Sequence, residues 1–64
     1  MQLSLEKVNL KRASKCMTVR AMAEAYGVSR ARMNVILNQR EVTPVCAGRL
    51  ARVLGVDVTE ILED

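Results

Sequence analysis

The sequence of 64 residues contains no histidine, tryptophan or phenylalanine, and Tyr26 is its one aromatic residue, although half of the residues are hydrophobic. A core without large rings must be built from Leu, Val, Ile, Met and Ala, which favours small packed helices over a β-sandwich. No apolar run approaches the ~20 residues needed to cross a membrane. The N-terminus has no apolar block followed by a small-residue cleavage site, so we expect no secretory signal and a cytoplasmic location.

The absence of histidine also excludes most kinds of metal site and of acid–base catalytic site. Cys16 and Cys46 are the two cysteines, and two thiols leave a tetrahedral zinc site incomplete. We interpret them as free thiols that act as small apolar residues rather than as a redox pair. The sequence has no nucleophile–base pair at a meaningful spacing and no glycine-rich phosphate loop. It therefore predicts no enzyme, no cofactor, no metal site and no small-molecule ligand.

Charge is divided unevenly along the chain. Residues 1–52 carry all ten Lys and Arg residues and three acids, a net charge of +7, whereas residues 53–64 carry four acids and no base. A basic body with an acidic end fits a polyanionic partner on one side of the molecule. On charge alone, a merely solvated surface is an equally good interpretation. We expect simple solvation for most of the basic residues outside the central region, namely Lys11, Arg12, Lys15, Arg49 and Arg52.

Helix-capping residues predict one all-α domain, residues 1–64, built as a compact bundle of about five short helices. Three segments follow a Ser or Thr N-cap: Val19–Tyr26 after Thr18, Arg30–Asn38 after Ser29, and Pro44–Leu54 after Thr43. Gly27 and Gly55 are expected to end the first and the third of them. Asp57 and Glu60 predict a capping box for a last helix, Val58–Glu63.

The first segment is predicted as a helix from about Leu5 to Lys15, with room for a short extended start at Leu3. Its register stays open, because both two-residue and three-residue spacings occur among its apolar positions. Elsewhere, helical spacing predicts a core that contains Ala23, Met33, Ile36, Leu37, Leu50, Leu54, Ile61 and Leu62, with Met17 and Met22 as filler.

The segment Arg30–Asn38 has a second face that is unusual for a solvated helix. Met33, Ile36 and Leu37 form its apolar stripe, while Ala31 and Val35 lie opposite, and no acid occurs between Ala25 and Arg40. The residues beside that small apolar centre are Arg30, Arg32, Asn34 and Asn38. Such a face suits the major groove of DNA, because small apolar groups contact thymine methyls, Asn pairs with adenine, and Arg pairs with guanine or phosphate.

Taken together, these residues resemble the Cro- and lambda-repressor-like helix-turn-helix family of XRE-type transcriptional regulators. The resemblance runs from Thr18 to Leu62, and "LARVLGVDVTEIL", Leu50–Leu62, is similar to the last two helices of that family. The motif positions are Ala23 at the close contact of the two helices, Gly27 in the turn, Val28 after it, and Met33 and Ile36 as buried anchors.

The resemblance implies a DNA-binding domain in which Val19–Tyr26 crosses the DNA backbone and Arg30–Asn38 enters the major groove. Base contacts are expected from Arg30, Ala31, Asn34 and Val35. Phosphate contacts are expected from Thr18, Arg20, Arg32, Asn38 and Arg40.

Three positions depart from the family pattern. Val19 stands where family members often carry a Gln that braces phosphate and recognition helix, so that contact is not expected here. Gln39 stands in place of the usual Gly after the recognition helix, and must take the turn with some strain or use another geometry. Cys16 also stands where Gly is frequent.

We therefore expect a sequence-specific double-stranded DNA-binding regulator, a repressor of bacterial, phage or mobile-element genes. It would act as a homodimer on half-sites about one helical turn apart. The alternative is a protein-interaction module of the same fold, such as an antirepressor that captures a partner repressor through Ala31 and Val35. Steep salt dependence of binding would distinguish DNA from an apolar protein contact.

Overall fold

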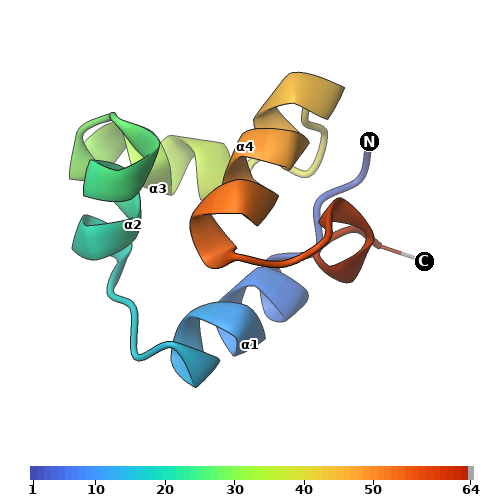
Figure 1. Cartoon of the computed structure of the whole chain (residues 1–64). Coiled ribbons are helices and arrows are strands. Elements are labelled where there is room, and N and C mark those ends of the chain that lie inside the picture. Colours follow the sequence, from blue (N-terminus) through green and yellow to red (C-terminus); the bar gives the residue numbers. More distant parts are fainter. Residues whose placement is uncertain (64) are drawn as a thin grey trace.

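Four α-helices and one short 3-10 helix follow one another along the part of the chain that the structure describes. This computed structural model describes residues 1–63. The elements are α1 (Leu5–Ser14), α2 (Val19–Tyr26), α3 (Arg30–Asn38), α4 (Pro44–Leu54) and the 3-10 helix η1 (Val58–Glu60) (Figure 1). The all-α class predicted from the sequence is confirmed. Asp64, one of the acids counted above, lies outside the described residues.

The predicted capping residues determine the bounds of three helices. The hydroxyl oxygens of Thr18, Ser29 and Thr43 accept hydrogen bonds from the backbone N–H groups three residues later, at 3.0, 3.1 and 3.1 Å. Each bond satisfies one of the free N–H groups of a helix start. Gly27 and Gly55 follow α2 and α4 with φ of 95° and 69°, the left-handed conformation that ends a helix. All three helices have the predicted bounds.

The last predicted helix, Val58–Glu63, is wrong in length and type. The capping box of Asp57 and Glu60 is present, but η1 ends at Glu60. Leu62 instead forms an antiparallel backbone bridge with Leu3, which removes it from any helix. The predicted fifth helix is therefore a single 3-10 turn within the described residues.

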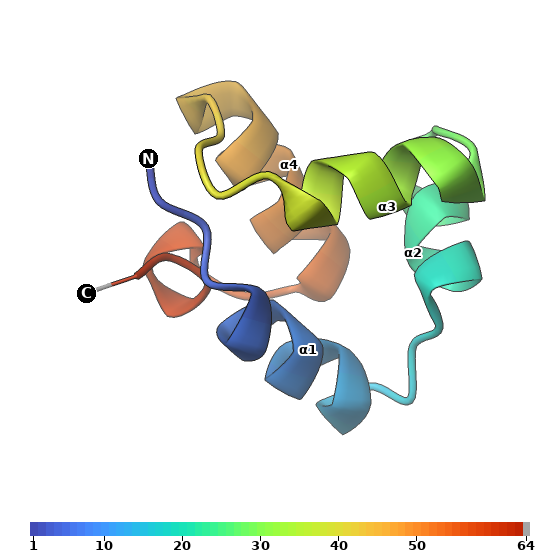
Figure 2. The ribbon, with the colours of Figure 1, turned by 180° about the vertical axis from the view of Figure 1, so that it is seen from behind.

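The extended start expected near Leu3 is confirmed, and it joins two distant parts of the chain. Leu3 N–H donates to the carbonyl of Arg40 at 2.7 Å, and Ser4 N–H donates to the carbonyl of Ile61 at 2.9 Å. Residues 2–3 thus lie between the loop after α3 and the segment after η1 (Figure 2). Ser4 also caps α1, which begins at Leu5 as predicted and ends at Ser14, one residue earlier than predicted.

One apolar core connects all of these elements. Met22, Met33, Leu50, Leu54, Ile61 and Val8 are the largest fully buried side chains. The predicted core residues are buried except Leu62, which is half-buried, as is Met17. Ala23, at 2% exposure, is the small residue expected where α2 and α3 meet. Burial of this aliphatic surface supplies the main favourable term in folding.

The arrangement leaves one long side of α3 at the surface. Viewed from behind, α3 runs across the upper part of the molecule, α2 lies beside its beginning, and α1 lies below (Figure 2). The link between α2 and α3 consists of residues 27–29. Within residues 1–63, no helix is both long and apolar enough to cross a membrane.

Two glycines should respond in opposite ways to substitution by alanine. Gly48 lies within α4, and a Cβ there would meet no atom of the described chain within 4 Å apart from its own helix backbone. Gly48→Ala should therefore raise the free energy of unfolding by roughly 0.5–1 kcal/mol, because glycine weakens a helix interior. Gly27→Ala should lower it by about 1–2 kcal/mol, because φ is positive there. Urea denaturation at constant m-value measures both changes. A loss of stability in Gly48→Ala would contradict this account.

The carboxylates of η1 should make stability fall in acid. The backbone N–H of Thr59 lowers the pKa of Asp57, and the backbone N–H of Asp57, followed by Lys11, lowers the pKa of Glu60. A lowered pKa in the folded state stabilises the fold above the unfolded pKa of about 4, and this contribution is lost as the pH falls through the folded value. The double variant Asp57→Asn, Glu60→Gln should flatten the stability profile below about pH 4, as measured by denaturation at a series of pH values. Glu24→Gln, on α2, is the control and should keep the wild-type profile.

Candidate nucleic-acid interface

The two sides of α3 differ as its sequence predicts. Met33, Ile36 and Leu37 are buried, whereas the side chains on the other side are exposed to solvent. The exposed group contains every residue predicted to contact bases: Arg30, Ala31, Asn34 and Val35. Val35 is 49% exposed, so an uncovered apolar side chain lies at the centre of this face.

An open groove separates the beginning of α2 from the exposed side of α3. Thr18, Val19 and Arg20 line it from α2, and Arg30 and Asn34 line it from α3. The free N–H groups at the start of α2 add partial positive charge there. Val19 is half-buried and lines the groove with an apolar side chain, so its side chain offers no hydrogen-bond donor to a ligand.

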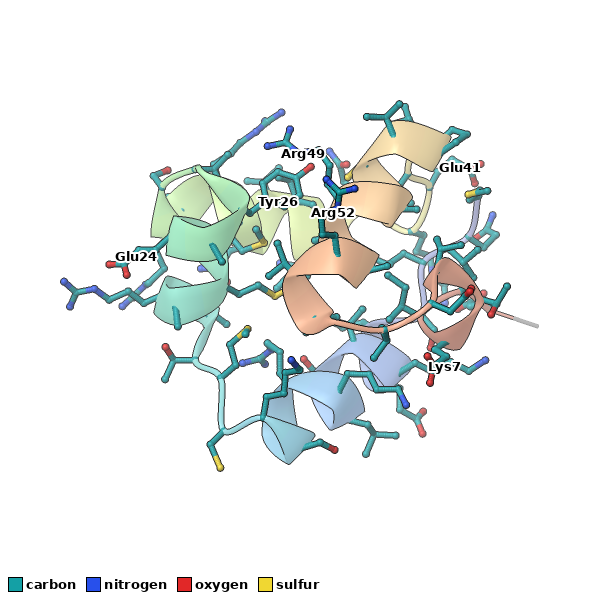
Figure 3. The ribbon with its side chains drawn as sticks, in the orientation of Figure 1. Lys7, Glu24, Tyr26, Glu41, Arg49 and Arg52 are labelled. Carbon is teal, nitrogen blue, oxygen red and sulfur yellow. The ribbon has the colours of Figure 1, made fainter. Side chains whose placement is uncertain are left out.

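Arg20 is the one residue of this groove whose charge is shared with an acid. Its Nε lies 3.7 Å from Glu24 Oε1, and both side chains are more than two-thirds exposed. Such a surface pair contributes little and is screened by salt. Glu24 extends from the outer side of α2 in Figure 3. The guanidinium of Arg20 is therefore free to exchange this partner for another anion.

The end of α3 continues into the extended loop that contains Arg40. Gln39 has φ of −78° and ψ of 127°, an extended conformation that any residue adopts without strain. Of the two alternatives given for Gln39, a strained turn or another geometry, the structure has the second. Asn38 Nδ2 donates to the carbonyl of Asn34, one turn earlier in α3, at 2.8 Å, which holds the amide against its own helix.

The cations of this face lack protein partners. Among residues 1–63, the side chains of Arg30, Arg32 and Arg40 make no hydrogen bond and no ion pair. No acid occurs in α3 or in its two flanking loops before Glu41. Burial, the largest effect, raises the pKa of the Tyr26 hydroxyl, and the positive charge of Arg32 opposes it with a smaller effect. The face is therefore positively charged around a small apolar centre.

Simple solvation, expected for several basic side chains, is wrong for three of them. Arg49 Cζ lies 4.1 Å from the centroid of the Tyr26 ring, and its Nη2 donates to the Tyr26 carbonyl at 2.8 Å (Figure 3). Arg12 is half-buried and donates to the carbonyl of Met17, next to the start of α2, at 3.1 Å. Lys11 pairs with Glu60 Oε1 at 3.1 Å. Two of these contacts join different helices and the third extends from α1 to the loop before α2, so no spacing within one helix indicates them.

The two cysteines have different environments. Cys16 has φ of 53° in the loop between α1 and α2, a left-handed conformation that favours glycine. Cys46 is half-buried and accepts a hydrogen bond from the Tyr26 hydroxyl at 3.5 Å. Both thiols are free. The described residues hold no group of three or more His, Cys, Asp or Glu side chains that could bind a metal ion.

Comparison of the sequence and the structure with protein-family models, curated proteins and solved structures finds no match.

The exposed face of α3 should have no structural role. Arg30→Ala and Val35→Glu should each change the free energy of unfolding by less than about 0.5 kcal/mol, because both side chains are exposed and make no hydrogen bond within residues 1–63. Met33→Ala, on the buried side of the same helix, should cost about 2–5 kcal/mol. Chemical denaturation of the three variants gives the comparison. A cost of about 2 kcal/mol or more for either exposed substitution would assign this face to the fold instead.

Proposed function

We propose that this protein is a sequence-specific double-stranded DNA-binding regulator of transcription, in which α2 and α3 act as a helix-turn-helix. One observation carries the proposal. The exposed side of α3 has a small apolar centre, Ala31 and Val35, surrounded by asparagines and by arginines that form no ion pair within residues 1–63, and it contains no acid. The resemblance of the sequence to the Cro- and lambda-repressor-like family also supports the proposal.

We assign base recognition to the residues at the centre of the exposed α3 face. The major groove is about 12 Å wide and admits an α-helix of this kind. Arg30 would pair with the two acceptor atoms of a guanine, and Asn34 with the donor and acceptor of an adenine. Ala31 and Val35 would contact thymine methyl groups. Within residues 1–63, Arg30 has no ion pair to break before it binds.

We assign contacts with the DNA backbone to residues at the edges of the α3 face. Thr18 and Arg20 lie at the beginning of α2, where the N–H groups of the helix attract phosphate. Arg32, Asn38 and Arg40 would contact phosphates further along α3 and in the loop after it. Asn38 keeps one amide proton for this purpose, since the other is bonded to Asn34.

The regulator would act as a homodimer, because one short helix reads few base pairs and two copies on adjacent half-sites increase affinity and specificity. Occupying a promoter in this way would repress transcription of bacterial, phage or mobile-element genes. Val53, Val56 and Val58 are half-buried, and their exposed parts would supply apolar surface for self-association. Light scattering over a range of concentrations, with and without DNA, tests the dimer.

An antirepressor that binds another repressor through α3 is the second candidate. The exposure of Val35 favours it, because an apolar protein contact also needs an uncovered side chain. We favour DNA since the apolar centre is small and the surrounding groups are cationic.

The test is a binding titration with random-sequence duplex DNA at low and moderate salt. Wild type should bind with a strong salt dependence, because each phosphate contact releases counterions. Arg30→Ala and Val35→Glu should each weaken binding by roughly tenfold or more. A folded wild-type protein that does not bind at low salt would contradict the proposal.

Two control variants separate the location of the change from its charge. Leu10→Glu introduces the same charge as Val35→Glu, at a residue that is 59% exposed on α1. Arg52→Ala removes the same charge as Arg30→Ala, but on α4. Both controls should bind DNA more tightly than their partners on α3. Equal losses in each pair would show that net charge alone governs binding.

A further inference from the structure

The outward side of α4 is the second uncovered surface of the molecule. Ala47, Leu50, Ala51 and Leu54 fill the core from one side of this helix. The opposite side forms a shallow groove lined by Val45, Gly48, Arg49 and Arg52. Val45 is 72% exposed, the highest value of any large apolar side chain among the described residues.

No contact within residues 1–63 requires a glycine at position 48 in this groove. Its φ is not positive, and a Cβ at this position would meet no atom of residues 1–63 outside its own helix backbone within 4 Å. Glycine inside a helix costs stability relative to alanine. A glycine that the fold does not need is explained if another backbone approaches α4 closely at this point.

The charges beside Gly48 define the chemistry of such a partner. Arg49 and Arg52 extend from α4 on the same side, and α4 contains no acid (Figure 3). The ring of Tyr26 holds the Arg49 guanidinium in place, and Arg52 makes no hydrogen bond or ion pair through its side chain within residues 1–63. The groove therefore presents one fixed and one free cation next to an apolar floor.

Two other occupants fit this surface less well. A second copy of α4 packed across Gly48 would bring its own Arg49 and Arg52 against those of the first, with no acid on either helix to balance them. A DNA backbone would pair with Arg49 and Arg52, but Val45 and Gly48, the other two lining residues, offer phosphate no side-chain donor.

We propose that the outward side of α4 binds an acidic amphipathic helix of a partner protein. The partner's small apolar residues pack on Val45 and over Gly48, and its carboxylates pair with Arg49 and Arg52. The four residues that line this groove all belong to α4 and none belongs to the α3 face, so the inference goes beyond DNA binding and does not depend on it.

The probe is a stapled helical peptide of about 15 residues, with a face of Ala and Leu flanked by glutamates. A second peptide has lysine in place of every glutamate. Fluorescence anisotropy with full-length protein should detect binding of the acidic peptide and much weaker binding of the basic one. Gly48→Gln, which keeps good helix propensity, should weaken the acidic peptide by roughly tenfold or more, as should Arg52→Glu.

Matched variants locate the contact. Leu10→Gln alters an exposed apolar side chain on α1, and Arg30→Ala removes a cation from α3; both should bind the peptide like wild type. Absence of peptide binding, equal binding of the two peptides, or full binding by Gly48→Gln would each overturn the proposal. Loss of DNA binding in Gly48→Gln would instead assign this side of α4 to DNA, and loss of self-association in that variant would assign it to a second copy.

Discussion

The fold depends on a single core made from aliphatic side chains and methionine. Because phenylalanine and tryptophan are absent, each element must contribute small or flexible groups, and Ala23 and Ala47 allow the helices to approach closely. Residues from α1 to the segment after η1 meet in this core. The inward sides of α3 and α4 are buried in this core, whereas their outward sides face solvent and make no contribution to it.

Much of this fold is predictable because its signals are local. A Ser or Thr cap before a helix and a glycine after it act over three or four residues, and α2, α3 and α4 have the bounds that such signals indicate. The division of α3 into a buried and an exposed side follows from periodicity within one helix. The candidate site was therefore visible in the sequence as a set of residues on one face.

Other features could not be predicted, since they depend on pairs of residues far apart in the chain. Leu3 and Leu62 come from opposite ends, and their backbone bridge replaces the end of the expected last helix. Arg49 and Tyr26 belong to different helices, and nothing in their spacing indicates that a ring would hold the guanidinium. The groove at Val19 likewise requires the packing of α2 on α3. The bond from Asn38 to Asn34 is the exception, because residues four apart share a helix face.

The shortness of α3 limits how much information one copy can read. Its nine residues extend for about 14 Å at 1.5 Å per residue. Base pairs rise by about 3.4 Å each, so such a helix spans about four of them. Four base pairs distinguish about 256 sequences, whereas a genome offers on the order of a million or more competing positions. The backbone becomes extended at Gln39, so α3 cannot contact more base pairs by continuing as a helix. If α3 reads DNA, a longer recognition sequence must therefore come from the number of copies bound and their spacing.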